Sequence, residues 1–287
     1  MIYPLVRDLA AEEIPVAVTC RVLKFSKQGY FKWTKRPCSR RDLENAYLTN
    51  VAVDVHRDDP AFGYRFIADE LEREGHQASE NRVWRLCSAQ RLWSLTSKKR
   101  GLSRRPGPPV HDDLVERDFT ASRPNELWLT DITEHRTREG KLYCCMVKDC
   151  FSNRIVGYAT GPRMTADLAV RALRHAVTLR GPGATIVHSD RGSQFRSMAF
   201  IRALRDSGLR GSMGRVAAAG DNAPMESFYS LLQKNVLDRK VWDSREELHL
   251  AIVHWVERTY HRRRRQRALG KLTPIEYETI YSDASVA

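Results

Sequence analysis

The sequence lacks any apolar run long enough to cross a membrane. Its 287 residues contain nothing approaching the about 18 consecutive apolar residues of a spanning helix. Residues 1–10 are also neither basic enough nor apolar enough for a signal peptide. These absences exclude integral membrane proteins and lead us to expect a cytoplasmic location.

Cysteine is scarce and has no framework spacing. The six cysteines form no Cys-x-x-Cys pair in the amino-terminal part, and no His-x-x-x-His pair accompanies them there. Disulfide-rich secreted domains and zinc modules depend on such spacings. We therefore expect reduced thiols and no zinc.

Acidic residues are too few to balance the basic ones. The 48 lysines and arginines exceed the 35 acids, so that the formal net charge is +13 and the isoelectric point is near 9.7. A field of this sign attracts polyanions and raises their encounter rate. With 42% hydrophobic residues, the chain can also bury a core, and its length suits two domains. The composition favours a globular protein with a nucleic-acid partner over a membrane-surface protein.

Helical periodicity dominates the first part of the chain. Helices are expected over residues 15–23, 27–35, 40–55, 64–74 and 80–90. Ser26 is expected to cap the helix over 27–35, Gly75 supplies a turn between the last two helices, and Ser79 caps the second of them. The pattern predicts an all-α helix-turn-helix region over residues 1–95.

Residues 96–122 have the composition of a basic linker. Lys98, Lys99 and Arg100 are followed by a proline- and glycine-rich stretch at 106–109. Such a segment offers no periodic apolar face for packing. We expect it to separate two domains.

The apolar pattern changes to alternation after the linker. The expected elements are strands over 127–136, 142–149, 155–160 and 185–187, and helices after Thr165, over 197–207, after Asn222 and after Ser244. Gly181 ends the first of these helices, Asn222 can cap the helix that follows it, and Ser244 with Glu247 forms a capping box for the last long one. This order of elements predicts an α/β domain of the ribonuclease-H-like type over residues 123–287.

Three acids stand in distinctive local settings. Asp131 lies in an expected strand, Asp190 ends another, and Glu226 falls near the start of a helix. Two divalent ions about 4 Å apart can hold the attacking and leaving oxygens of a phosphodiester displacement, and they need hard anionic oxygens on rigid elements. Clustered carboxylates repel one another unless a cation shares their site. The three acids therefore predict a site for two Mg²⁺ or Mn²⁺ ions.

Several stretches resemble the retroviral-integrase-like DDE superfamily, and within it the second-reading-frame (OrfB-type) transposases of bacterial insertion sequences. The similar stretches are residues 128–133, 188–195, 221–228, 262–265, 269–270 and 273–274, and upstream 63–65 and 82–86. Together they cover most of the chain. The resemblance implies an integrase catalytic core of ribonuclease-H-like fold, with Asp131, Asp190 and Glu226 as its catalytic, metal-binding triad.

The resemblance also implies a reaction and partners. A transposase of this type cleaves double-stranded DNA at the element's ends and joins the freed 3'-hydroxyl to another strand by transesterification. Joining of the two ends would give a circular intermediate before insertion into target DNA. The expected partners are further copies of the chain in a synaptic complex and a first-frame product, fused or associated, at the nucleoid.

Basic side chains in four places are candidates for DNA contacts. They are Arg82, Arg85, Lys98, Lys99, Arg100, Lys234, Arg262, Arg263, Arg264 and Arg265. The last four are too dense for ordinary helix solvation, because like charges on neighbouring turns are destabilising. Many relatives carry Lys or Arg seven residues after the catalytic Glu. This chain has Gln233 there, with Lys234 beside it and about 100° further round the helix.

Two other functional classes remain open from the sequence. A non-catalytic helix-turn-helix regulator would bind DNA and make no use of the acids. A tyrosine recombinase would use Tyr260, although no spaced Arg and His constellation accompanies it. His188 is expected to pack at a strand end, with at most a minor supporting function.

Overall fold

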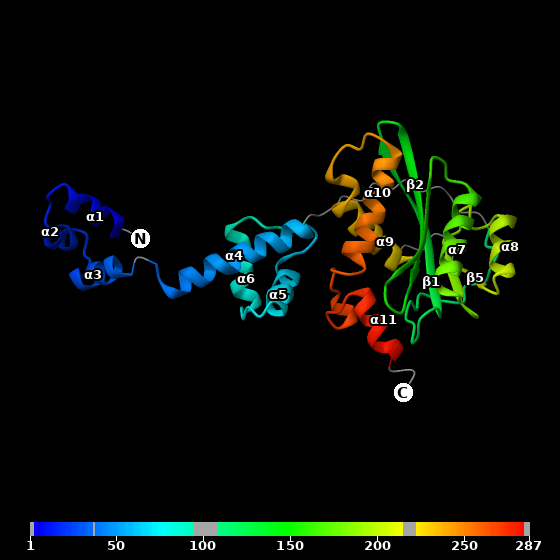
Figure 1. The fold of residues 1–287 in the computed structure, drawn as a ribbon, viewed down its shortest axis with the longest axis horizontal. Coiled ribbons are helices and arrows are strands. Elements are labelled where there is room, and N and C mark those ends of the chain that lie inside the picture. The colour runs from blue at the N-terminus through cyan, green and yellow to red at the C-terminus, as the bar shows by residue number, and fades with distance from the viewer. Residues whose placement is uncertain (1–2, 37, 95–107, 215–221, 284–287) are drawn as a thin grey trace. The chain divides into compact units, whose positions relative to one another are not determined.

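The computed structural model describes residues 3–36, 38–94, 108–214 and 222–283. The chain divides into two compact units (Figure 1). One comprises Met1–Asp58 and Phe62–Ser94, and the other Asp59–Ala61 and Leu95–Ala287. The predicted linker cations Lys98, Lys99 and Arg100 lie outside the described residues.

Three short helices begin the first unit: α1 (Tyr3–Ala11), α2 (Val16–Val22) and α3 (Lys27–Lys35). The hydroxyl of Ser26 accepts a 3.0 Å hydrogen bond from the N–H of Gly29, which confirms the predicted cap of α3. The sequence did not predict α1, in which only Val6 is buried, so that its apolar stripe is weak.

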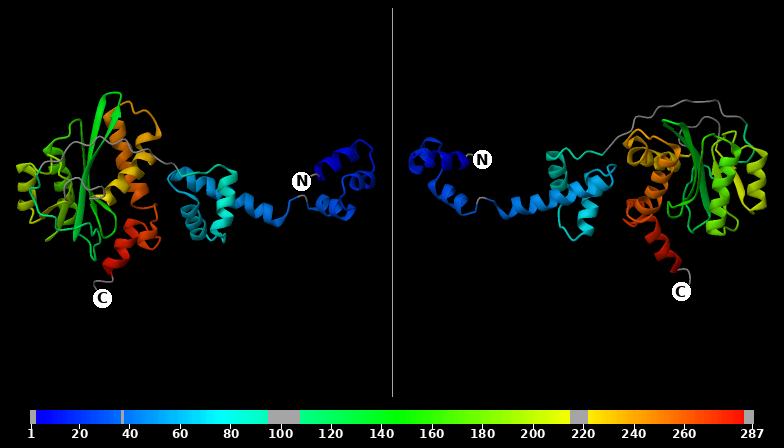
Figure 2. Two further views of the ribbon diagram at one scale, coloured as in Figure 1. Left: turned by 180° about the vertical axis from the view of Figure 1, so that it is seen from behind. Right: turned by 45° about the horizontal axis from the view of Figure 1, so that its top comes forward.

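The other helices of this unit are α4 (Arg40–Asp58), α5 (Tyr64–Arg73) and α6 (Glu80–Ala89). Figure 2 shows α5 and α6, in cyan, beside the carboxyl-terminal half of α4. Gly75 adopts the left-handed conformation, with φ of +84°, and the hydroxyl of Ser79 caps α6. The predicted helix pair and its turn are confirmed.

A five-stranded mixed sheet forms the centre of the second unit, in the order β3-β2-β1-β4-β5. The strands are β1 (Leu127–Thr137), β2 (Gly140–Asp149), β3 (Ile155–Gly161), β4 (Ile186–Ser189) and β5 (Arg210–Met213). The first three are antiparallel, and β4 and β5 continue the sheet in parallel with β1. The sequence did not predict β5, because its four residues contain no apolar run.

Helices cover both faces of this sheet (Figure 1). On one face lie α7 (Ala166–Arg180) and α8 (Met198–Asp206), and on the other α9 (Ala223–Asn235) and α10 (Arg245–His254). The backbone of α7 approaches β3 so closely that a Cβ on Gly157 would lie 2.5 Å from the carbonyl oxygen of Ala172. The fold is the ribonuclease-H-like α/β fold predicted from the order of elements.

The chain after α10 departs from the prediction. The helix continues as a π-helical segment (Trp255–Tyr260), and a further helix, α11 (Pro274–Asp283), follows. The expectation that the helix after Ser244 is the last was therefore wrong. A local signal existed, because Thr273 and Glu276 form a capping box around the start of α11, with bonds of 2.9 and 3.2 Å.

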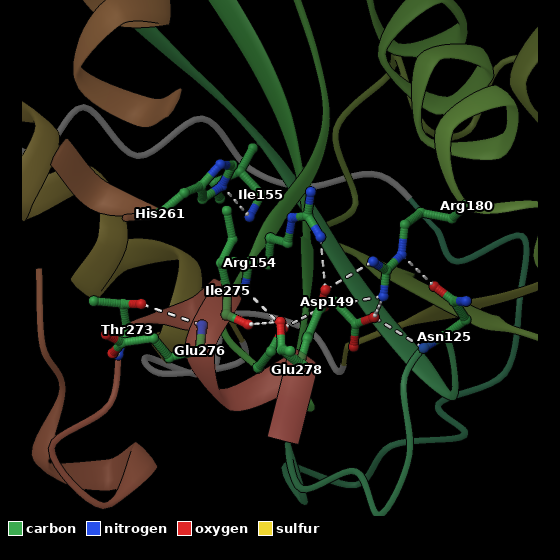
Figure 3. A network of polar contacts seen from close by, with 12 residues as sticks. Asn125, Asp149, Arg154, Ile155, Arg180, His261, Thr273, Ile275, Glu276 and Glu278 are labelled. Atoms are coloured by element: carbon green, nitrogen blue, oxygen red, sulfur yellow. Dashed lines mark hydrogen bonds and ion pairs between the residues drawn. The ribbon is translucent and has the colours of Figure 1, made fainter. Parts of the chain in front are cut away.

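A buried polar network attaches α11 to the sheet and to α7 (Figure 3). The carboxylate of Glu278 accepts hydrogen bonds from Arg180 at 2.9 and 3.0 Å, from Arg154 at 2.7 Å and from the hydroxyl of Ser152 at 2.7 Å. Asp149, at the end of β2, accepts a further bond from Arg180. The network fixes the end of the described chain to the core.

Two expectations from composition concern the whole chain. All six cysteines are free thiols in the structure, four of them buried. No helix in the described ranges combines the length and the apolar composition that spanning a bilayer requires.

Candidate active site

The register of two parallel strands brings Asp131 and Asp190 together. In the pairing of β1 with β4, the last partners are Thr130 and Ser189. Asp131 is the next residue of β1 and Asp190 is the first residue after β4, and equivalent positions on adjacent parallel strands point to the same face. Adjacent strands lie about 4.8 Å apart, so the two carboxylates leave the sheet as neighbours.

Asp131 is half-buried on the sheet face that α9 covers. Its carboxylate accepts a 2.7 Å hydrogen bond from the N–H of Ile132. Burial raises the pKa of Asp131 to about 8, and the charge of Asp190 adds to the rise; the bond from Ile132 opposes it, and the charge of Glu226 makes a further upward contribution. The charges of the other two predicted acids therefore both act on Asp131.

A glycine holds Asp190 in the loop after β4. The N–H of Gly192 donates a 2.9 Å hydrogen bond to Asp190, and a Cβ on Gly192 would lie 2.9 Å from the same carboxylate oxygen. Loss of hydration raises the pKa of Asp190, while the bond from Gly192 partly offsets this effect. The residue is exposed, and the buried ring of Phe195 anchors the loop behind it. Within residues 188–195, Gly192 therefore holds the carboxylate of Asp190, and Phe195 fixes the loop that carries both.

Glu226 is exposed near the start of α9, which is attached to β1 by side chains on either side of it. The amide of Asn222 donates a 3.1 Å hydrogen bond to the carbonyl oxygen of Thr130, and the hydroxyl of Tyr229 donates a 2.6 Å bond to that of Asp131. The helix also buries Met225, Phe228 and Leu232. Asn222 stands at the N-cap position, but its side chain makes no capping bond, which corrects the prediction: its Nδ2 donates to Thr130, and its Oδ1 accepts no hydrogen bond from the described residues.

The donor chemistry of this site suits a hard divalent cation. In the part of the chain that the structure describes, no three His, Cys, Asp or Glu side chains lie close enough together to hold one ion. Asp131 in β1, Asp190 directly after β4 and Glu226 in α9 are instead carboxylates from three parts of the fold, and the charges of the last two raise the pKa of Asp131. A cation with oxygen ligands would offset this repulsion and the burial of Asp131.

The two predicted DNA contacts on α6 have different surroundings. Arg82 donates a 2.9 Å hydrogen bond to Asn45 and forms an ion pair with Glu44, both on α4. Arg85 is exposed and has no hydrogen-bond or ion-pair partner among the described residues. Arg82 therefore contributes to the packing of the helix pair, while Arg85 is available to a ligand.

The carboxyl-terminal arginines also divide into two kinds. Arg262 and Arg263 are exposed. Arg264 is 6% exposed, and Arg265 forms two 2.8 Å hydrogen bonds with the carboxylate of Glu276. The prediction that phosphate neutralises all four needs correction for Arg264 and Arg265, because one is buried and the other has an internal carboxylate partner. Lys234 is half-buried, and Gln233 donates a hydrogen bond to Asp238.

Sequence reasoning missed Lys148, which lies in β2 and is 5% exposed. Its ammonium group donates a 3.2 Å hydrogen bond to the carbonyl oxygen of Pro224, in the first turn of α9. Burial lowers the pKa of Lys148 to about 8. The available signal was a lysine directly after the apolar run of residues 142–147.

Two further candidates from the sequence, His188 and Tyr260, are buried and hydrogen-bonded within the core. His188 is buried, with its Nδ1 3.0 Å from the hydroxyl of Ser212 and its ring edge-on to Phe119, in agreement with a packing role. Tyr260 is 2% exposed, and its hydroxyl donates to the carbonyl oxygen of Asn153 at 2.9 Å. Burial raises the pKa of Tyr260, which does not suit the nucleophile of a tyrosine recombinase.

Comparisons with known proteins agree with this architecture. Two models of the integrase core domain match residues 121–219 and 226–280, and a model of an HTH-like domain matches residues 42–100. Transposase InsF for insertion sequence IS3A of Escherichia coli (strain K12) is 34% identical over 272 residues, which are 93% of this chain and 94% of that protein. The insertion element IS600 uncharacterized 31 kDa protein of Shigella sonnei is 33% identical over 266 residues, 91% of this chain and 98% of that protein.

A solved structure resembles part of the chain. The HTLV-2 integrase catalytic core domain in complex with magnesium covers 55% of this chain and 99% of its own, at 19% identity and a TM-score of 0.44. The alternative of a non-catalytic regulator is wrong, because the HTH-like domain and the integrase core are matched in one chain whose relatives are transposases. The chain belongs to the second-reading-frame (OrfB-type) transposases of bacterial insertion sequences, within the retroviral-integrase-like DDE superfamily.

Proposed function

We propose that Asp131, Asp190 and Glu226 are the catalytic carboxylates of this transposase and that they hold Mg²⁺ or Mn²⁺, two ions in number. The observation that carries the proposal is the parallel register at Thr130 and Ser189, which makes Asp131 and Asp190 neighbours. The effect of Glu226 on the pKa of Asp131 supports its inclusion. When bound, two such ions supply Lewis-acid stabilisation to the attacking and leaving oxygens of a phosphodiester.

The proposed reaction has two displacements at phosphorus. In the first, water attacks a phosphodiester at an element end, one P–O bond forms, one breaks, and a 3'-hydroxyl is released. In the second, this 3'-hydroxyl attacks a phosphodiester of another DNA strand, again with one P–O bond formed and one broken. The carboxylates orient the reactants and no side chain becomes covalently attached, so the protein's contribution is position and charge.

The division of the chain gives the DNA-binding part of the proposal. We assign residues 1–95 to recognition of element ends, 96–122 to a linker and 123–287 to catalysis. The exposed Arg85 on α6 suits a groove or phosphate contact, and Arg262, Arg263 and Lys234 suit phosphate contacts beside the core. Self-association in a synaptic complex, association with a first-frame product and location at the nucleoid belong to the same proposal.

Substitution of each acid tests the site. Asp131→Asn, Asp190→Asn and Glu226→Gln should each lower cleavage and strand transfer of labelled element-end DNA by at least about 100-fold, with DNA binding and Tm nearly unchanged. Asp206→Asn is a matched control, because Asp206 is an exposed acid at the end of α8 on the opposite face of the sheet. An acid whose variant keeps near-normal strand transfer does not belong to the triad.

A further inference from the structure

We propose that Asn222 and Tyr229 are positioning residues, which set Glu226 beside Asp131 by attaching α9 to the backbone of β1. The proposal rests on the catalytic role assigned to Glu226 above. It gives a function to two side chains that contact neither DNA nor metal ions in the proposed reaction.

The two hydrogen-bonding residues lie on either side of Glu226 along the chain. Asn222 is the N-cap residue directly before α9, and Glu226 and Tyr229, three residues apart, are neighbours on the surface of the helix. The two outer members make the hydrogen bonds, of 3.1 and 2.6 Å, and Glu226 lies between them. A displacement of the helix along β1 would break at least one bond.

The two hydrogen bonds end on adjacent main-chain carbonyl groups of β1. Asn222 and Tyr229 bond to the main-chain carbonyls of two consecutive residues, Thr130 and Asp131. One of these residues carries a proposed catalytic carboxylate, so the bond from Tyr229 ends on the main chain of the residue that Glu226 must face. The hydroxyl also lies 3.4 Å from the carbonyl oxygen of Cys144 on β2.

Apolar packing alone would not define this position as closely. Met225, Phe228 and Leu232 are buried and orient the face of α9 toward the sheet, but contacts between apolar groups are non-directional. Hydrogen bonds weaken steeply with distance and angle. Lys148 adds a third directed contact, from β2 to the carbonyl oxygen of Pro224 in the first turn. The part of α9 around Glu226 is therefore held from two strands.

The test removes one hydroxyl and compares it with a matched one. Tyr229→Phe keeps the ring and loses the bond to Asp131. Tyr260→Phe is the control, because Tyr260 belongs to the same apolar cluster and its hydroxyl also donates to a main-chain carbonyl, that of Asn153, at 2.9 Å. Asn222→Ala removes the other attachment without altering a ring in the core.

Two measurements on the full chain separate positioning from stability. The first is Mn²⁺ binding by calorimetry in the absence of DNA, and the second is kcat and KM for strand transfer. We expect Tyr229→Phe and Asn222→Ala each to weaken Mn²⁺ binding and to lower kcat by about 10-fold, with KM for DNA unchanged, since small misplacements cost rate. Tyr260→Phe should lower Tm by about as much as Tyr229→Phe does, since each loses one hydrogen bond. It should change neither Mn²⁺ binding nor kcat.

The outcomes distinguish this inference from the proposed function. If Tyr229→Phe and Asn222→Ala match Tyr260→Phe in Mn²⁺ affinity and kcat while Glu226→Gln is inactive, the positioning role is overturned and the triad stands. If Glu226→Gln retains strand transfer, Glu226 is not catalytic, and the proposed function is contradicted before the positioning role is tested. Loss of both Mn²⁺ affinity and kcat in either positioning variant, with the control unchanged, supports the inference.

Discussion

Arg180, the last residue of α7, holds Glu278 of α11 through two hydrogen bonds, of 2.9 and 3.0 Å. The two side chains are only 12% and 8% exposed. Burial alone would raise the pKa of Glu278, but hydrogen bonds from Arg180, Ser152 and Arg154 bring it below its ordinary value. The carboxylate is therefore charged at neutral pH and accepts four hydrogen bonds, and it joins α11 to the core.

Replacing this carboxylate should destabilise the protein in a pH-dependent way. Glu278→Gln leaves the guanidinium of Arg154 without its carboxylate and that of Arg180 with Asp149 alone, and we expect a loss of about 3 kcal/mol in unfolding free energy at pH 7. The folded-state pKa lies below the ordinary 4.5, so this contribution is present above pH 4.5 and is lost as pH falls through the lower folded value. Urea unfolding of both proteins from neutral to acid pH measures the difference. A difference that does not shrink on acidification would contradict the assignment.

The buried Lys148 should destabilise the folded protein at neutral pH, whereas Glu278 stabilises it. Its folded pKa is lowered from 10.5 to about 8, so the wild-type protein should gain stability as pH rises between these values, where the unfolded chain holds the proton more tightly. Lys148→Met should remove this rise and should stabilise the protein at pH 7. The gain is the cost of burying the charge, about 3 kcal/mol, minus the contribution of the lost hydrogen bond to Pro224. Unfolding curves at pH 7 and near pH 10 test both points. Equal pH dependence of variant and wild type would refute the prediction.

The two kinds of carboxyl-terminal arginine should respond differently in DNA binding. Arg262→Gln and Arg263→Gln should each reduce the slope of log affinity against log salt concentration by about one unit, if each neutralises one phosphate. Arg265→Gln should leave that slope unchanged and lower Tm, because Glu276 loses its bidentate partner. Fluorescence anisotropy over a range of salt concentrations provides the measurement. If the slope falls for Arg265→Gln but not for Arg262→Gln or Arg263→Gln, the assignment of DNA contacts to Arg262 and Arg263 is wrong.

Separation of the chain should separate recognition from chemistry. A fragment of residues 111–287 contains all the strands of the described sheet and the three acids, and we expect it to fold alone. Its Mg²⁺- or Mn²⁺-dependent nicking should be weak and indifferent to end sequence, because the helices that position DNA are missing. A fragment of residues 1–105 should bind element ends without chemistry. Full end-specific strand transfer by residues 111–287 would overturn the proposed role of the amino-terminal helices.

Part of the fold was predictable because its signals are local. The caps at Ser26 and Ser79 and the turn at Gly75 depend on a few adjacent residues, and the structure has each of them. The strands β1, β2 and β3 were equally visible, because short runs of apolar, aromatic and β-branched residues bounded by turn residues are typical of strands. The three acids were found from their neighbouring residues, although their assignment as a triad remains a proposal.

The sequence by itself determined the class of elements, their order, the excess of positive charge and the candidate acids, since these depend on composition and local periodicity. The tertiary structure decided which of those residues are available to a partner. Arg265 meets Glu276, Lys148 is buried beneath α9, and Asn222 bonds to Thr130 instead of capping its helix. Each outcome depends on a contact made when the strands pair and the helices pack, and the energy of burying a charge or an amide is set by such contacts and not by neighbours in the chain.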